Sequence, residues 1–149
     1  MKHAGWDDYH VKNFLKNHVK SLYTNATIKR DAKNIINRLK HEGNNIIIIT
    51  SRSKNHYTNP YEISAEWLEK YGIEYDKLVV EGNNKAKECI ENNIDILIDD
   101  QIGFLQDVSN NTNTKVLMFD SPYNKECNEF QRVSSWQEVY DEIKKIELQ

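Results

Sequence analysis

Four consecutive isoleucines at positions 46–49 restrict the fold of this chain more than any other stretch. The run stops abruptly at Thr50, Ser51 and Arg52. A strand with one face in water alternates apolar and polar residues, whereas a strand buried on both faces of a parallel sheet reads as a continuous apolar run. We therefore expect an inner strand of a parallel sheet that has helices on both faces.

Helical and extended patterns alternate along the chain, which predicts right-handed βαβ crossovers. The expected fold class is therefore α/β, with a parallel sheet in a three-layer arrangement. Strands are predicted near residues 45–50, 77–81, 95–99 and 115–119, and helical stripes near residues 11–22, 28–39, 63–71, 86–90, 102–109 and 139–146.

Local signals mark where several of these helices begin and end. Gly43 and Gly72 stand where helix C-caps belong. Asn59 precedes Pro60, which is typical of a first helical turn. Ser135 lies three residues before a glutamate, a spacing that predicts a capping box at the last helix.

Length and composition exclude several classes of protein. The 149 residues predict one domain, residues 1–149, and the formal net charge of -3 gives no basic surface for nucleic acid. The two cysteines, far apart, favour a reducing compartment over a zinc or disulfide framework. An apolar run of four residues is far shorter than the roughly 20 that span a bilayer. We expect a cytoplasmic protein without a membrane partner.

Polar residues follow three of the predicted strands. In open parallel sheets, ligands bind beyond the carboxyl ends of the strands. Thr50 and Ser51 end the isoleucine strand, Lys85 opens the helix after "KLVV", and Asp99 and Asp100 end "DILIDD". Hydroxyls can hydrogen-bond a phosphate, a lysine can neutralise it, and carboxylates can hold Mg²⁺.

Each of these residues also has an ordinary structural interpretation. One of the two aspartates could cap the helix near 102–109 while the other is solvated, and Lys85 could be a solvated lysine. Asp120, followed by Ser-Pro-Tyr-Asn, is typical of a simple turn.

The ordered segments "IIIITSR", "NNKAKEC" and "DILIDD" resemble motifs two to four of the haloacid dehalogenase-like (HAD) phosphohydrolases. The longer segments "ISAEWLEKYGIEYDKLVV", "VLMFDSPYN" and "RVSSWQEV" resemble the 5'(3')-deoxyribonucleotidase-like branch and its bacterial relatives. The resemblance spans residues 20 to 146. It implies a Rossmann-like HAD fold and an Mg²⁺-dependent phosphomonoester hydrolase that acts on a small, nucleotide-like substrate.

The resemblance also assigns residues. It implies that Thr50 and Ser51 bind the transferring phosphoryl group, that Lys85, rather than Lys87, steadies it, and that Thr50 and Lys85 are catalytic. The metal ligands implied are Asp99 and Asp100. Arg52 lies beside motif two, with a weaker case for a role.

The first motif of that family, D-x-D on the central strand, has no counterpart before Thr50. Without this strand the sheet would have a gap of about 10 Å between the strands of motifs two and four. We expect residues 1–25 to be a remnant of the cap region or an N-terminal helix, and residues 26–149 to form the core. A homo-oligomer or a donated strand could complete the sheet. The alternative is a non-catalytic HAD-fold protein that binds a phosphorylated ligand or a protein partner.

Overall fold

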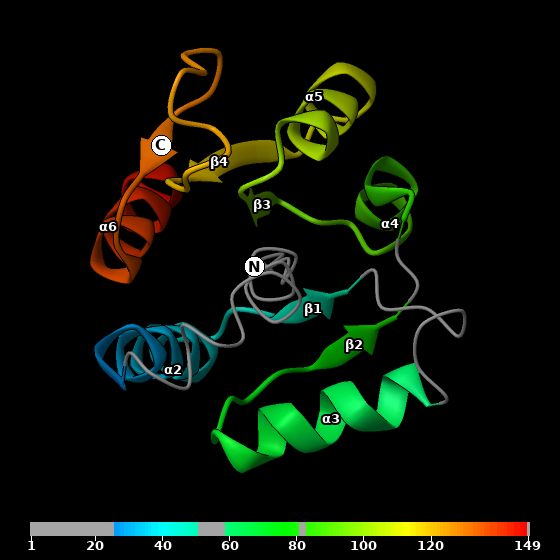
Figure 1. Cartoon of the computed structure of the whole chain (residues 1–149), viewed down its shortest axis with the longest axis vertical. Helices are drawn as coiled ribbons and strands as arrows, with labels where there is room; N and C mark the ends of the chain where they lie inside the picture. Colours follow the sequence, from blue (N-terminus) through cyan, green and yellow to red (C-terminus); the bar gives the residue numbers. More distant parts are fainter. Residues whose placement is uncertain (1–25, 51–58, 81–82, 149) are drawn as a thin grey trace.

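The computed structural model of the chain describes residues 26–50, 59–80 and 83–148. The predicted helix near 11–22, the cap remnant, Ser51 and Arg52 lie outside these residues. Within the described ranges, no helix is both long and apolar enough to cross a bilayer. The elements, shown in Figure 1, are α2 (Ala26–His41), β1 (Ile47–Ile49), α3 (Pro60–Lys70), β2 (Lys77–Val79), α4 (Lys85–Glu91), β3 (Ile96–Asp99), α5 (Ile102–Asn111), β4 (Lys115–Phe119), β5 (Arg132–Val133) and α6 (Trp136–Glu147).

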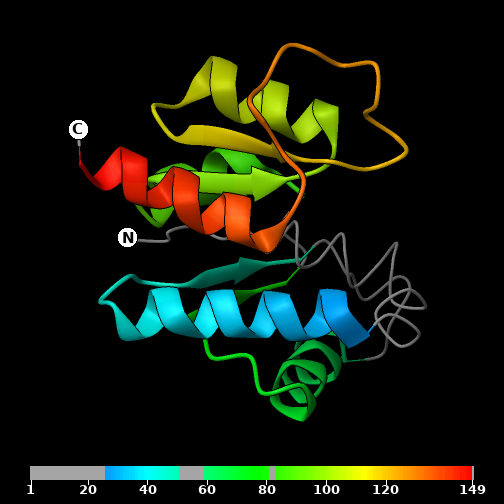
Figure 2. The same ribbon diagram turned by 90° about the vertical axis from the view of Figure 1, so that its left-hand side faces the viewer.

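The strands in the described residues form two parallel sheets rather than one continuous sheet. β1 pairs with β2, with Ile48 opposite Leu78, and β3, β4 and β5 form the second sheet, with Ile98 opposite Leu117. The arrowheads of β1 and β3 point the same way in Figure 2. Among the described strands, none pairs with both β1 and β3. The α/β class with parallel strands is confirmed, and the interruption lies where the sequence predicts a missing strand.

Two apolar clusters cover opposite faces of the strands and make three layers. One contains Ile48 and Ile98 with apolar residues of α2, α3 and α6. The other contains Ile47 and Leu97 with apolar residues of α4 and α5. Successive side chains of a strand point to opposite faces, so a strand between two helical layers must be apolar at every position. This requirement explains the run of isoleucines. Both β1 and β3 contribute residues to each of the two clusters.

The predicted helix ends agree with the structure except for one capping bond. Gly43 follows α2 with a φ of +99°, a left-handed conformation that glycine adopts without steric cost. Ser135 Oγ accepts a 3.1 Å hydrogen bond from the Glu138 N–H, which confirms the cap of α6. Asn59 occupies the N-cap position of α3, but its side chain makes no capping hydrogen bond.

Candidate active site

Thr50 lies directly after β1, at the carboxyl end of the two-stranded sheet. Its backbone N–H donates a 2.8 Å hydrogen bond to the Val79 carbonyl, which extends the ladder by one residue. The residue is fully buried. This ladder bond fixes the backbone from which the Thr50 hydroxyl projects.

Asp99 and Asp100 are both buried at the end of β3. Asp99 Oδ1 accepts a 2.9 Å hydrogen bond from the Gln101 N–H, and Gln101 is the N-cap of α5. The interpretation as one helix cap and one solvated carboxylate is wrong, because Asp99 lies two residues before the cap and Asp100 is only 1% exposed. Burial penalises charged carboxylates, so such a pair favours a nearby cation.

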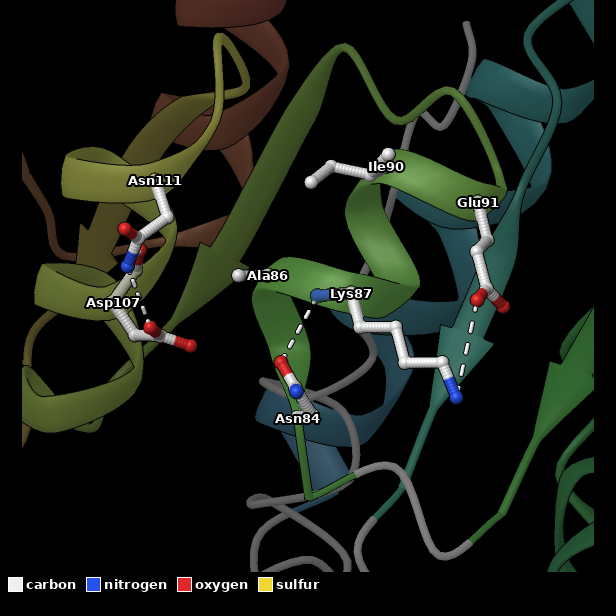
Figure 3. Close-up of a pocket in the computed structure, with 7 residues that line it drawn as sticks. All are labelled: Asn84, Ala86, Lys87, Ile90, Glu91, Asp107 and Asn111. Atoms are coloured by element: carbon white, nitrogen blue, oxygen red, sulfur yellow. Dashed lines mark hydrogen bonds and ion pairs between the residues drawn. The ribbon is translucent and has the colours of Figure 1, made fainter.

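Lys85, the first residue of α4, is fully buried. Its Nζ lies 5.4 Å from the centre of the Phe104 ring, which belongs to α5. Lys87 instead has a 60% exposed side chain, and its Nζ lies 3.9 Å from Glu91. Figure 3 draws this ion pair. The structure therefore separates the two lysines, and the interpretation of Lys85 as solvated is wrong.

Cys89 on α4 is a buried thiol whose pKa responds to the charges of both Lys85 and Asp99. Burial raises the pKa of this thiol to about 12. A hydrogen bond involving Thr114 and the positive charge of Lys85 lower the pKa, and the negative charge of Asp99 raises it. Lys85 and Asp99 thus both lie within electrostatic reach of one buried thiol.

A hollow of about 380 Å³ between α4 and α5 lies apart from these residues. Its lining, drawn in Figure 3, contains none of the predicted site residues. Ile90 lines it and is 60% exposed, whereas Ala86 and Cys89 on the same helix are buried. The buried face of this short helix runs through Lys85, Ala86 and Cys89, which leaves Ile90 at its margin.

Sequence reasoning missed Asn124 and Arg132. The predicted turn after Asp120 exists, since the Asn124 N–H donates to the Ser121 carbonyl at 3.2 Å. The Asn124 side chain also donates to the Asp100 carbonyl at 3.0 Å. Asparagine is common in turns for local reasons, so nothing in "DSPYN" indicated a contact with a distant strand.

The donor chemistry at the end of β3 fits a hard divalent cation. Carboxylate oxygens are the ligands that Mg²⁺ prefers, and Asp99 and Asp100 supply them from adjacent positions. In the part of the chain that the structure describes, no group of three or more His, Cys, Asp or Glu side chains could hold a metal. The two aspartates alone are therefore too few for a complete metal site, and their role as ligands stays a prediction.

A parallel α/β domain with a buried lysine and paired acids at its strand ends has the features of a HAD-type hydrolase. A solved HAD-superfamily hydrolase from Ehrlichia chaffeensis shares the fold, with a TM-score of 0.51 and 13% sequence identity over 76% of this chain and 56% of that one. The sequence model of the family "5' nucleotidase, deoxy (Pyrimidine), cytosolic type C protein" matches residues 6–149. The chain belongs to this nucleotidase family.

A curated relative carries a similar name. "Putative nucleotidase YqfW" of Bacillus subtilis (strain 168) is 31% identical over 105 residues, which cover 70% of this chain. The matched region covers 52% of that protein, so this chain matches about half the length of its relative.

Proposed function

We propose that this chain carries the phosphate-binding and metal-binding residues of an Mg²⁺-dependent phosphomonoester hydrolase of nucleotidase type. The observation that carries the proposal is the burial of Thr50, Lys85, Asp99 and Asp100 at or just beyond the carboxyl ends of parallel strands. The substrate would be a small nucleotide-like phosphate ester. The word "cytosolic" in the family description supports a cytoplasmic location.

Each residue has a role that follows from its chemistry. The Thr50 hydroxyl, with that of Ser51, would donate hydrogen bonds to phosphoryl oxygens. The Lys85 ammonium would offset the negative charge of the transferring group, an effect that low solvent exposure strengthens. Asp99 and Asp100 would hold Mg²⁺, which supplies Lewis-acid polarisation of a phosphoryl oxygen.

The attacking group has to come from elsewhere, because the 149 residues contain no D-x-D sequence. In the proposed reaction an aspartate oxygen bonds to phosphorus, the ester oxygen leaves with a proton, and water then hydrolyses the aspartyl-phosphate. The interruption between β1 and β3 is where a strand bearing that aspartate would fit. Another protein that carries such a strand could donate it, since unpaired strand edges accept added strands. A second copy of this chain could fill the interruption with a strand but could not supply the aspartate, because it lacks D-x-D as well.

The test compares the 149-residue chain with a version preceded by a D-x-D strand. Both are assayed with Mg²⁺ against deoxynucleoside monophosphates and an aryl phosphate. We expect negligible turnover from the chain alone and robust turnover from the extended version. Asp99→Asn in the extended version should lower kcat by about a thousandfold, roughly 4 kcal/mol of barrier.

Two outcomes would contradict the proposal in different ways. Robust turnover by the chain alone, abolished by Asp99→Asn, would show that it uses another nucleophile. Tight binding of a phosphorylated ligand by the extended version, without turnover, would favour the alternative of a non-catalytic phosphate-binding protein, which the absence of D-x-D supports.

A further inference from the structure

Asn124 is a buried carboxamide whose hydrogen-bonding groups are all engaged. Its Nδ2 donates to the Asp100 carbonyl at 3.0 Å and to the Phe119 carbonyl at 2.9 Å. Its Oδ1 accepts from the Ser121 N–H at 3.1 Å and from Arg132 Nη1 at 2.9 Å. The side chain thereby joins the ends of β3 and β4 at the edge where the acidic pair lies.

Arg132, in β5, holds Asn124 in place from the other side. Its Nη2 donates to the carbonyls of Asn124 and Cys127, each at 2.9 Å. Its Nη1 also donates to Asp120 Oδ1 at 2.7 Å. A guanidinium has a rigid planar array of donors, so these contacts tie the loop after β4 to β5 at several points.

The contact with Asp100 acts on a peptide unit that also holds Asp99. The Asp100 carbonyl and the Gln101 N–H belong to one planar peptide group. Its oxygen accepts from Asn124 at 3.0 Å, and its N–H donates to Asp99 Oδ1 at 2.9 Å. Rotation of this peptide would break both hydrogen bonds and release the Asp99 carboxylate.

We propose that Asn124, held by Arg132, is a positioning residue that fixes the Asp99–Asp100 pair for cation binding through the peptide between Asp100 and Gln101. This inference rests on the proposed metal role of the two aspartates. Residues that orient metal ligands typically change metal affinity by about 10-fold to 100-fold when they are mutated. The effect reaches the metal through the peptide plane, without contact between Asn124 and the ion.

Asn124→Asp tests this mechanism selectively. A carboxylate can still accept from Ser121 and Arg132, but it cannot donate to Asp100 or Phe119. Its added negative charge would by itself strengthen cation binding, so weaker binding cannot be a charge effect. Asn124→Leu removes the same donors without adding charge and serves as a second variant.

Asn37→Asp is a matched control in another part of the fold. Asn37 donates to the Gly72 carbonyl at 2.8 Å and accepts from the Glu74 N–H at 2.8 Å. The substitution thus removes a side-chain donor and keeps the acceptor, as at Asn124, but at a partly buried position of α2 that bonds to the turn after α3.

The probe is Mn²⁺ alone, titrated into the full chain and followed by electron paramagnetic resonance of the free ion. Circular dichroism first establishes that each variant is folded. We expect the Mn²⁺ Kd to rise about tenfold or more in both Asn124 variants and to stay within about twofold of wild type in Asn37→Asp. Asp100→Asn in an otherwise wild-type chain shows whether the signal comes from the proposed site.

The other outcomes separate this inference from the proposed function. If Asp100→Asn weakens Mn²⁺ binding but folded Asn124 variants bind within about twofold of wild type, the positioning role is wrong and the metal site stands. An Asn37→Asp effect as large as that of Asn124→Asp would also overturn it, because general destabilisation would then explain both. If Asp100→Asn leaves binding unchanged, the proposed metal site fails, and this inference fails with it.

Discussion

The two sheets differ in the hydrogen bonds that fix the carboxyl ends of their strands, where Thr50 and the Asp99–Asp100 pair lie. In the β1–β2 sheet, the backbone hydrogen bond from Thr50 to Val79 continues the strand ladder. In the β3–β4–β5 sheet, the Asp99–Asp100 end is connected to the neighbouring strands by the side chains of Asn124 and Arg132. The Asp100–Asn124 contact joins residues 24 positions apart.

This difference indicates where each sheet is sensitive to mutation. A ladder bond is a backbone property and survives most substitutions, whereas a side-chain contact is lost when the side chain changes. We therefore expect substitutions to perturb the three-stranded sheet more than equivalent substitutions in the two-stranded sheet. Four pairs of substitutions compare the parts of the fold around the two sheets; the first three pairs are expected to differ, and the fourth pair is expected to match.

The largest difference in unfolding free energy between the two sheets should come from substitutions in the apolar core. Leu97 in β3 is fully buried, and Leu78 in β2 is 7% exposed. Leu97→Ala should lower the free energy of unfolding by about 3–4 kcal/mol and Leu78→Ala by about 2 kcal/mol, because the cost rises with the cavity left behind. Urea unfolding of both variants measures this, and a larger loss for Leu78→Ala would reverse the comparison.

Arg132 and Lys40 are cations that each pair with an aspartate. Arg132 binds Asp120 and several carbonyls, whereas Lys40 binds Asp76 at 2.7 Å. Arg132→Ala should cost about 2 kcal/mol, because it removes several hydrogen bonds to partly buried acceptors, and Lys40→Ala less than about 1 kcal/mol. Equal shifts in the urea midpoint would show that the extra contacts of Arg132 add no stability.

The N-caps of α6 and α3 differ in one hydrogen bond. The Ser135 side chain caps α6, and the Asn59 side chain makes no capping bond at α3. Ser135→Ala should therefore cost about 1 kcal/mol, and Asn59→Ala should cost close to zero. Thermal unfolding measures both, and a loss at Asn59 equal to that at Ser135 would count against this difference.

The smallest effect concerns acid sensitivity. Hydrogen bonding and charge from Lys125 and Arg132 lower the pKa of Asp120. Burial opposes ionisation of Asp76, but hydrogen bonds from Lys40 and the Ile46 N–H outweigh it and lower that pKa too. A lowered folded-state pKa gives stability that is present above the unfolded pKa and lost as the pH falls through the folded one.

Asp120→Asn and Asp76→Asn should each remove less than about 1 kcal/mol at neutral pH, because both carboxylates are partly exposed. The difference in free energy of unfolding between each variant and the wild type should become smaller below about pH 4, the ordinary range of an aspartate pKa. Urea unfolding at several pH values measures this difference. A difference that stays constant with pH would show that the lost stability does not come from the charge.

The sequence predicted the regular elements and the residues at the strand ends. The four predicted strands exist, α6 begins after Ser135, and Asp99 ends β3, because these features depend on neighbouring residues and on local apolar periodicity. Among the described strands, β1 and β3 do not pair, and the explanation by an absent D-x-D strand stays a prediction. The roles of Thr50 and Lys85 stay predictions until the assays are done.

Tertiary structure alone decided which of these residues are buried and what holds them. Lys85 and Lys87 are two positions apart on one helix, and only packing against α5 leaves one buried beside Phe104 and the other in solvent. Asn124 in its turn has the sequence pattern of any turn asparagine, yet it reaches Asp100 because β3 and β4 lie side by side. A local sequence pattern specifies where helices and strands begin and end. Contacts between segments distant in sequence exist only after the sheet has formed.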